Sequence, residues 1–103
     1  MQVLIGISTL CQTANNPYNG KIASQSYALS KAILDNTVKA TGAKSRGVTR
    51  TDTMSGINWS KVPVTIIEMG FLSNEKEDKL LASSAYQAKL VSGMVNGLKE
   101  YLK

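Results

Sequence analysis

Short β-branched runs alternate along the chain with longer stretches of helical spacing. The segment from Val3 to Cys11 is rich in β-forming and apolar residues and predicts a strand, with Gly6 interrupting it. The run Val-Thr-Ile-Ile over residues 64–67 predicts a second strand. Its continuous β-branched character is typical of a central strand buried on both faces. Because strands alternate with helices, the pattern predicts an α/β layer arrangement.

The first helical stretch lies in the amino-terminal half of the chain. It is expected to begin at Ser24 or Ser26 and to run to about Thr41, where Gly42 favours a helix end. Apolar residues recur in it near the 3.6-residue period. The predicted core-facing positions are Leu29, Ala32, Ile33 and Val38.

The last twenty residues carry the strongest periodic signal. A helix is expected to begin at Ser83 or Ser84, and a shorter helix from Asn74 to about Ala82 is predicted by the capping spacing of Asn74 and Glu77. Apolar residues at helical spacing predict one buried face on the final helix. The positions on that face are Tyr86, Leu90, Met94, Leu98 and Tyr101 or Leu102, with Val91 and Val95 beside them.

Two segments are predicted to be loops. Residues 15–20, Asn-Asn-Pro-Tyr-Asn-Gly, consist of turn-forming residues. Residues 43–60 are polar and contain two glycines and several threonines, with Ile57 and Trp59 as isolated anchors. No repeat, low-complexity tract or linker divides the chain, so we expect a single domain.

The charge balance favours an anionic partner. Twelve Lys and Arg against seven Asp and Glu give the 103 residues a net charge of +5. This charge suits nucleic acid, a membrane surface or an acidic cell wall. The basic residues are scattered and form no stripe interleaved with aromatic residues, so specific nucleic-acid binding is not expected.

Membrane insertion is not expected either. No run of about eighteen apolar residues occurs, so no transmembrane helix is predicted. The apolar start of the chain is short and lacks a positively charged segment, so no signal peptide is predicted.

The absence of histidine excludes several kinds of chemistry for this chain on its own. With no His in the sequence, a Ser–His triad, a His-ligated zinc and an imidazole base are excluded. The single cysteine, Cys11, excludes an internal disulfide and a metal site made from a Cys pair.

Glu68 is the most informative candidate for chemistry, because it follows directly after the β-branched run. A strand would carry this carboxylate to the end of a sheet, where open α/β folds bind their ligands. Apolar surroundings would raise its pKa and suit it to general acid–base catalysis. The alternative is a strand-end glutamate that points into solvent. Gly70, two residues later, serves either a close approach to a ligand or an ordinary turn.

The residues around Glu68 resemble a known family. The string VPVTIIEMGFLSNEKEDKLLAS over residues 62–83 resembles the carboxyl-terminal block of the zinc-dependent N-acetylmuramoyl-L-alanine amidases of the amidase-3 family. The strings AYQAK at 85–89 and GLKEY at 97–101 continue the resemblance, and SRGV at 45–48 resembles an element that the family places upstream. The resemblance covers nearly the whole chain.

This resemblance implies a reaction and roles for three residues. The family cleaves the amide between N-acetylmuramic acid and the L-alanine of the stem peptide of peptidoglycan. Glu68 matches the glutamate that takes a proton from the attacking water and passes it to the leaving amine, as general base and acid. Arg46 is a candidate to bind a carboxylate of the stem peptide, with a solvated loop arginine as the alternative, and Gly70 is a second candidate for substrate contact.

One departure from the family pattern is decisive for the expected activity. The family binds zinc through a His, a Glu and a second His in its amino-terminal half, and residues 1–103 contain no such set. The resemblance therefore implies the carboxyl-terminal portion of a three-layer mixed sheet flanked by helices, a partial amidase-3 catalytic domain. We expect no zinc on this chain and no amidase activity from it alone.

The missing zinc ligands also bear on partners and location. The expected partners are peptidoglycan and either a second copy of the chain or an amino-terminal amidase half, with residues 3–10 as the expected contact. The family implies a cell-wall or extracellular location. The alternatives are a non-catalytic module that binds the cell wall or pairs with an amidase, and an unrelated basic α/β module that binds nucleic acid.

Overall fold

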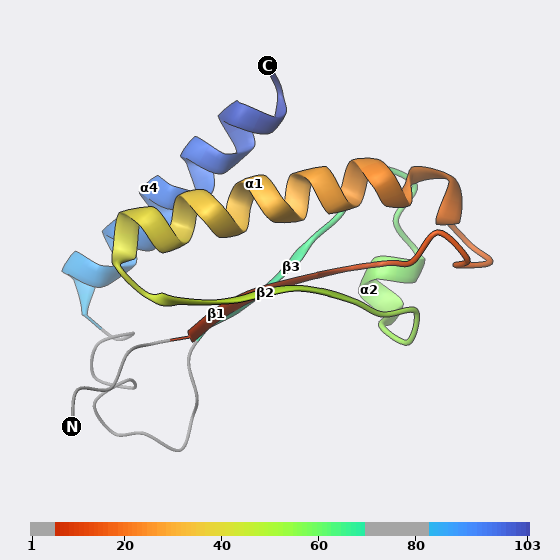
Figure 1. The fold of residues 1–103 in the computed structure, drawn as a ribbon, viewed down its shortest axis with the longest axis horizontal. Helices are drawn as coiled ribbons and strands as arrows, with labels where there is room; N and C mark the ends of the chain where they lie inside the picture. The colour runs from red at the N-terminus through yellow and green to blue at the C-terminus, as the bar shows by residue number, and fades with distance from the viewer. Residues whose placement is uncertain (1–5, 70–82) are drawn as a thin grey trace.

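The structure is a computed structural model that describes residues 6–69 and 83–103. Three strands and two long helices make up most of it (Figure 1). In chain order the elements are β1 (Gly6–Cys11), the 3-10 turn η1 (Gly20–Ile22), α1 (Ala23–Thr41), β2 (Lys44–Arg50), α2 (Ser55–Asn58), β3 (Ile66–Met69) and α4 (Ser84–Tyr101).

The sheet has the strand order β2-β1-β3. Strand β1 pairs with β2 in parallel and with β3 in antiparallel orientation. The sheet is therefore mixed and is flanked by helices, as the resemblance implied. Within the described residues no helix is both long and apolar enough to cross a membrane.

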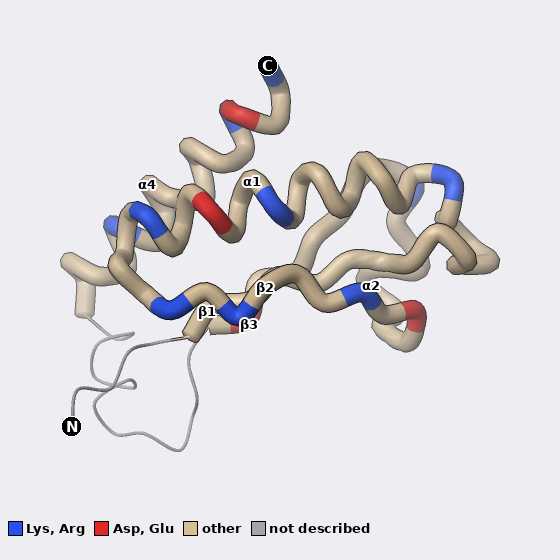
Figure 2. The backbone as a smooth tube through the Cα atoms, viewed as in Figure 1, with Lys and Arg blue, Asp and Glu red and all other residues tan. Residues whose placement is uncertain are grey.

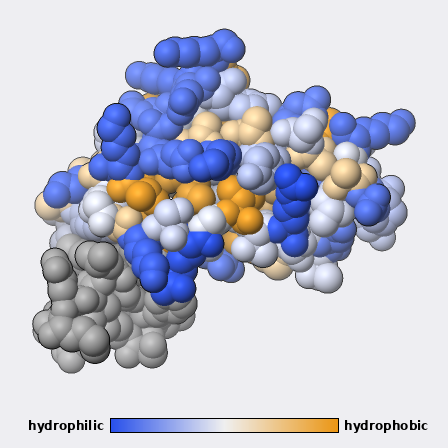
Figure 3. Space-filling view, viewed as in Figure 1, coloured by the Kyte–Doolittle hydropathy of each residue, from blue (hydrophilic) through white to orange (hydrophobic). Residues whose placement is uncertain are grey.

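Alternate residues of β1 face opposite layers. The Thr9 hydroxyl donates a hydrogen bond to the Ser30 carbonyl oxygen of α1 at 3.1 Å, so Ile7, Thr9 and Cys11 face the helices. Helices α1 and α4 lie together on this side of the sheet, whereas α2 lies on the other side (Figure 1). Figure 3 shows apolar side chains in a band between α1 and the strands, with hydrophilic side chains above and below.

Helix α1 confirms the predicted bounds to within three residues. It ends at Gly42, which has φ 72° and donates its N–H to the Val38 carbonyl oxygen. Leu29 and Ile33 are buried as predicted, but Ala32 and Val38 are only half-buried. Small polar residues take part in the buried face instead, namely Ser26, Ser30 and Thr37. The Ser26 hydroxyl accepts a hydrogen bond from the Val64 N–H, and the Ser30 hydroxyl donates one to the Thr65 hydroxyl.

Helix α4 begins as predicted, with the Ser83 hydroxyl accepting a hydrogen bond from the Tyr86 N–H. Its buried face is different from the predicted one. Tyr86 and Leu90 are buried, but Leu98 and Leu102 are exposed. Two glycines, Gly93 and Gly97, are buried in their place, because α4 crosses the backbone of α1 at close range there.

The prediction of a loop over residues 43–60 was wrong, because this segment contains β2 and α2. Strand β2 lies at an edge of the sheet and carries Lys44, Arg46 and Arg50, so its sequence lacks an apolar run. Figure 2 shows basic positions spaced along this strand. Ile57 is fully buried, which confirms it as an anchor, whereas Trp59 is 80% exposed.

The prediction of a central buried strand for residues 64–67 was also wrong. Strand β3 covers Ile66–Met69 and has a half-buried first half and an exposed second half. Within residues 6–69 and 83–103 it lies at the other edge of the sheet. A short β-branched run does not distinguish an edge from a centre, because both favour such residues. The predicted helix over residues 74–82 lies outside the described residues.

Candidate active site

Glu68 lies on β3 directly opposite Ser8 of β1. The Ser8 hydroxyl donates a hydrogen bond to Glu68 Oε2 at 3.5 Å, the long end of the hydrogen-bond range. Since Thr9 faces the helices, Ser8 and Glu68 face the opposite side of the sheet. The Glu68 side chain is exposed, so the expected apolar surroundings were wrong.

The position of Glu68 along the sheet also differs from the expected one. Strand β3 runs antiparallel to β1, so Glu68 lies near the amino-terminal ends of the two parallel strands. Open α/β folds bind ligands at the carboxyl-terminal ends. That general rule therefore does not account for a site at Glu68.

Arg46 reaches the same face of the sheet through an irregularity in β2. Between Ile7 and Thr9 the pairing of β1 with β2 slips by one residue, and Gly47 on β2 has φ 83°. An extra residue of this kind is a β-bulge, which changes the direction of the neighbouring side chain. The Arg46 side chain lies over Gly6. A Cβ atom added to residue 6 would overlap the Nε and Cδ atoms of Arg46.

Strand β1 thus brings two predicted site residues together. Arg46 covers Gly6 and Glu68 faces Ser8, and these two β1 positions lie about 7 Å apart on one face. A carboxylate that accepts protons and a guanidinium that pairs with carboxylates are therefore neighbours on an accessible surface. The third predicted residue, Gly70, lies outside the described residues.

Sequence reasoning missed Gly6 and Ser8 as site residues. Gly6 was noted only as an interruption of the strand, although an isolated glycine in a strand often marks a close approach by another group. Ser8 becomes recognisable only when the register with β3 is known. Neither register nor bulge can be deduced from the strand sequences alone.

A second polar cluster lies at the carboxyl-terminal end of β1. Asp52 accepts hydrogen bonds from the Thr13 hydroxyl at 2.6 Å, the Thr13 N–H at 2.9 Å and the Asn16 amide at 2.9 Å. These donors hold the pKa of Asp52 below its ordinary value, with the Thr13 hydroxyl contributing most. Asn58 joins the cluster by donating to the Asp52 carbonyl oxygen. The cluster ties the loop after β1 to the segment that holds α2.

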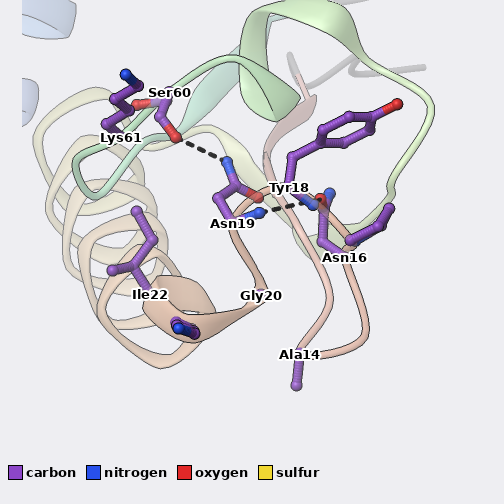
Figure 4. A pocket seen from close by; sticks show the side chains of 10 residues that line it. Ala14, Asn16, Tyr18, Asn19, Gly20, Ile22, Ser60 and Lys61 are labelled. Atoms are coloured by element: carbon purple, nitrogen blue, oxygen red, sulfur yellow. Dashed lines mark hydrogen bonds between the residues drawn. The ribbon is translucent and has the colours of Figure 1, made fainter.

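A cavity of about 520 Å³ adjoins this cluster (Figure 4). The Asn19 side chain closes one wall by donating hydrogen bonds to the carbonyl oxygens of Ile57 and Ser60. Lys21 and Lys61 also line it. The cavity follows the carboxyl-terminal end of β1, whereas Glu68 lies near its amino-terminal end, so the two are separate features.

The residues of this chain do not fit a zinc site of the type that the resemblance implies. Zinc in proteins is held by three or four Cys, His, Asp or Glu side chains. The sequence contains no His, and across residues 6–69 and 83–103 no three His, Cys, Asp or Glu residues gather closely enough to hold a metal. The His ligands of such a site would therefore have to come from another part of the protein or another chain.

Residues 3–100 match the amidase-3 family, described as N-acetylmuramoyl-L-alanine amidase. Over 73 residues the chain is 32% identical to the uncharacterized protein YqiI of Bacillus subtilis strain 168, a match that covers 71% of this chain and 35% of YqiI. Over 68 residues it is 28% identical to the Staphylococcus aureus protein named Probable cell wall amidase LytH, covering 66% of this chain and 23% of LytH.

Solved structures agree with this assignment. The CwlD amidase of Clostridioides difficile, solved in complex with the GerS lipoprotein, matches with a TM-score of 0.80 and 31% identity, covering 95% of this chain and 46% of CwlD. An N-acetylmuramoyl-L-alanine amidase from Clostridium difficile 630 matches with a TM-score of 0.80 and 25% identity, covering 99% of this chain and 50% of that amidase.

The chain spans about half the length of these solved amidases and between 23% and 35% of the curated relatives. The sequence match extends over almost the whole chain, and the fold match does so as well. The chain belongs to the amidase-3 family of N-acetylmuramoyl-L-alanine amidases.

Proposed function

We propose that this chain is the part of a peptidoglycan amidase that supplies the proton-transferring glutamate. The reaction is cleavage of the amide between N-acetylmuramic acid and the L-alanine of the stem peptide. The observation that carries the proposal is the position of Glu68: it lies within the family match, on an accessible face of the sheet, beside Arg46. Family membership supports the substrate, and the geometry supports the residue.

Glu68 acts as general base and then as general acid. Its carboxylate accepts the proton of the attacking water and passes it to the nitrogen of the leaving amine. Exposure of the side chain allows a polymer as large as peptidoglycan to reach it. The Ser8 hydroxyl holds one carboxylate oxygen, Oε2, which leaves the other free to accept the proton.

Arg46 positions the substrate by pairing with a carboxylate of the stem peptide. A guanidinium binds a carboxylate through two parallel hydrogen bonds, which fixes orientation as well as affinity. The bulge at Gly47 and the lack of a side chain at Gly6 keep Arg46 on the face that carries Glu68. A substrate contact by Gly70 remains a prediction from the resemblance.

The chain on its own is inactive as an amidase in this proposal. Polarisation of the scissile carbonyl and activation of water are the tasks of the family's zinc, and the residues present do not fit it. A working enzyme therefore needs ligands from elsewhere. Its substrate implies that it works at the cell wall or outside the cell.

The test uses a fusion protein in which the chain replaces the matched part of C. difficile CwlD. We expect this CwlD fusion to release amino groups from purified peptidoglycan, and Glu68→Gln to reduce the rate at least about 100-fold. Glu100→Gln on α4 is the matched control and should retain the rate. Full activity of the Glu68→Gln fusion would contradict the role of Glu68.

A second function is favoured by the lack of a fitting metal site. The chain would then be a non-catalytic module that binds the cell wall or pairs with an amidase. Two measurements separate this function from the first. Co-sedimentation with peptidoglycan measures binding by the chain, and release of amino groups measures the activity of the CwlD fusion. Binding by the chain together with an inactive fusion would favour the module.

A further inference from the structure

The cavity at the carboxyl-terminal end of β1 has no part in the proposed chemistry, and we call it the Asn19 cavity. Its volume of about 520 Å³ falls within the range of roughly 300–1,000 Å³ that is typical of small-molecule sites. It is lined by the loop after β1, by η1, and by Ser60 and Lys61. Strand β1 itself is paired on both sides within the described part of the chain, so the expected contact at residues 3–10 was wrong for residues 6–10.

An unpaired hydrogen-bond acceptor lies in the wall of the Asn19 cavity. Asn19 is only 7% exposed, and its amide N–H groups donate to the carbonyl oxygens of Ile57 at 2.7 Å and Ser60 at 3.0 Å. These two bonds fix the orientation of the amide, and within residues 6–69 and 83–103 they leave Oδ1 without a partner. Buried polar atoms are nearly always paired, so an unpaired one calls for an explanation. An acceptor in a cavity wall fits a ligand that carries hydroxyl or amide donors.

Two lysines make the cavity positive. Lys21 and Lys61 line it and are exposed, and neither forms an ion pair with another described residue. Among the described residues no Asp or Glu lines the cavity. The carboxylate of the neighbouring cluster, Asp52, is already held by hydrogen bonds from Thr13 and Asn16. The two ammonium groups therefore favour a ligand with a negative charge.

Two exposed aromatic side chains accompany the cavity. Tyr18 lines it and is 72% exposed, and Figure 4 shows Tyr18 and Lys61 on opposite sides of Asn19. Trp59, which directly precedes Ser60 in the chain, is 80% exposed. An exposed aromatic ring offers a flat apolar face on which the C–H face of a sugar can pack. Aromatic rings beside amide and ammonium groups thus favour a sugar as the ligand.

We propose that the Asn19 cavity binds an acidic sugar, the N-acetylmuramic acid of a glycan strand that has lost its stem peptide. Hydrolysis of the amide frees the lactyl carboxylate of this sugar, so the product carries a negative charge beside the ring. The carboxylate pairs with Lys21 and Lys61, the ring packs on Tyr18, and a hydroxyl or acetamido N–H donates to Asn19 Oδ1. The choice of this sugar rests on the proposed function. Because the cavity and Glu68 lie at different ends of β1, the cavity is a second site, which retains the product strand.

The test titrates the chain with the disaccharide of N-acetylglucosamine and N-acetylmuramic acid, by calorimetry and by the emission of Trp59, the only tryptophan. It measures binding without catalysis, so its failure is distinguishable from a failure of the role of Glu68. We expect the disaccharide to bind and to change the emission of Trp59. The same disaccharide with its carboxylate amidated, and neutral diacetylchitobiose, should bind at least about 10-fold more weakly, because a charge-assisted pair is lost.

Variants locate the binding. Lys21→Gln combined with Lys61→Gln should weaken binding of the acidic disaccharide about 10-fold and remove its advantage over the amidated form. The matched control is Lys39→Gln combined with Lys99→Gln, which removes the same charge from exposed positions of α1 and α4 and should keep the affinity. Tyr18→Ala should weaken both forms alike, because packing on the ring is independent of the carboxylate.

Four results would overturn the inference. They are no binding of the disaccharide at millimolar concentration, binding that leaves the emission of Trp59 unchanged, equal affinity for the acidic and amidated forms, and an effect of the Lys21 and Lys61 variant no larger than that of its control. Poly(glycerol phosphate), a polyanion without sugar rings, completes the comparison. It should bind more weakly per repeat than the disaccharide, and equal binding would reduce the cavity to a general anion site and so contradict the proposal.

Discussion

Ser8 and Glu68 are paired residues of β1 and β3, and the Ser8 hydroxyl donates to Glu68 Oε2. Because the two strands hold both residues, the carboxylate is oriented by the sheet. Removal of the hydroxyl by Ser8→Ala should lower kcat of the CwlD fusion about fivefold, the effect of one weak hydrogen bond, with KM unchanged.

The matched control for Ser8→Ala is Ser92→Ala at an exposed position of α4, which should retain kcat. The melting temperature separates positioning from a general loss of folding. A positioning role predicts that Ser8→Ala lowers kcat while the melting temperature of the fusion stays that of the parent. An unchanged kcat would contradict the positioning role of Ser8.

Arg46 should affect substrate binding more than the chemical step. Arg46→Gln in the CwlD fusion should raise KM about tenfold for stem peptides with free carboxylates, because a charge-assisted pair is lost. Peptides whose carboxylates are amidated should show no difference. Arg50→Gln is the control from the same strand, since Arg50 lies over the Tyr27 ring at 4.4 Å. Equal losses for both kinds of peptide would count against carboxylate recognition.

The crossing of α1 and α4 depends on glycine. A Cβ on Gly97 would lie 2.5 Å from Ile33 Cα and 2.7 Å from the Ala32 carbonyl oxygen, and backbone atoms cannot move aside as side chains do. Gly97→Ala should therefore lower the free energy of unfolding by about 2 kcal/mol, although alanine favours helices in general. Urea unfolding of the chain measures the change. Gly56→Ala, which meets no atom within 4 Å, should not destabilise the protein.

Asp52 should make stability depend on pH. Its pKa is lowered in the folded state, chiefly by the hydrogen bond from the Thr13 hydroxyl. Its contribution to stability is therefore present above the unfolded pKa of about 3.9 and is lost as pH falls through the folded pKa. Asp52→Asn should be less stable than the parent chain in urea at pH 7, and the two should converge at acidic pH. A difference of equal size at both pH values would be inconsistent with a charge effect.

The sequence predicted those parts of the fold that rest on local signals. The cap at Ser83 and the helix end at Gly42 follow from side-chain and backbone preferences within one turn, and both are observed. Strand β2 could not be predicted, because an edge strand with charged side chains lacks the apolar pattern. The buried glycines of α4 were missed, because a close helix crossing replaces side chains by backbone contacts.

The candidate site was predicted in part for the same reasons. Glu68 and Arg46 came from motifs, which specify residue types. Their proximity depends on the register of β3 and on the bulge in β2, which are tertiary features. Exposure of Glu68 depends on the edge position of β3, which the β-branched run did not reveal.

The central claim is that this chain carries the proton-transferring half of an amidase site and depends on metal ligands held elsewhere. Its most direct test is the release of amino groups from purified peptidoglycan, with zinc added, by the chain alone and by the CwlD fusion. We predict release by the fusion, loss of that release with Glu68→Gln, and none by the chain. Zinc-dependent release by the purified chain alone would contradict the claim.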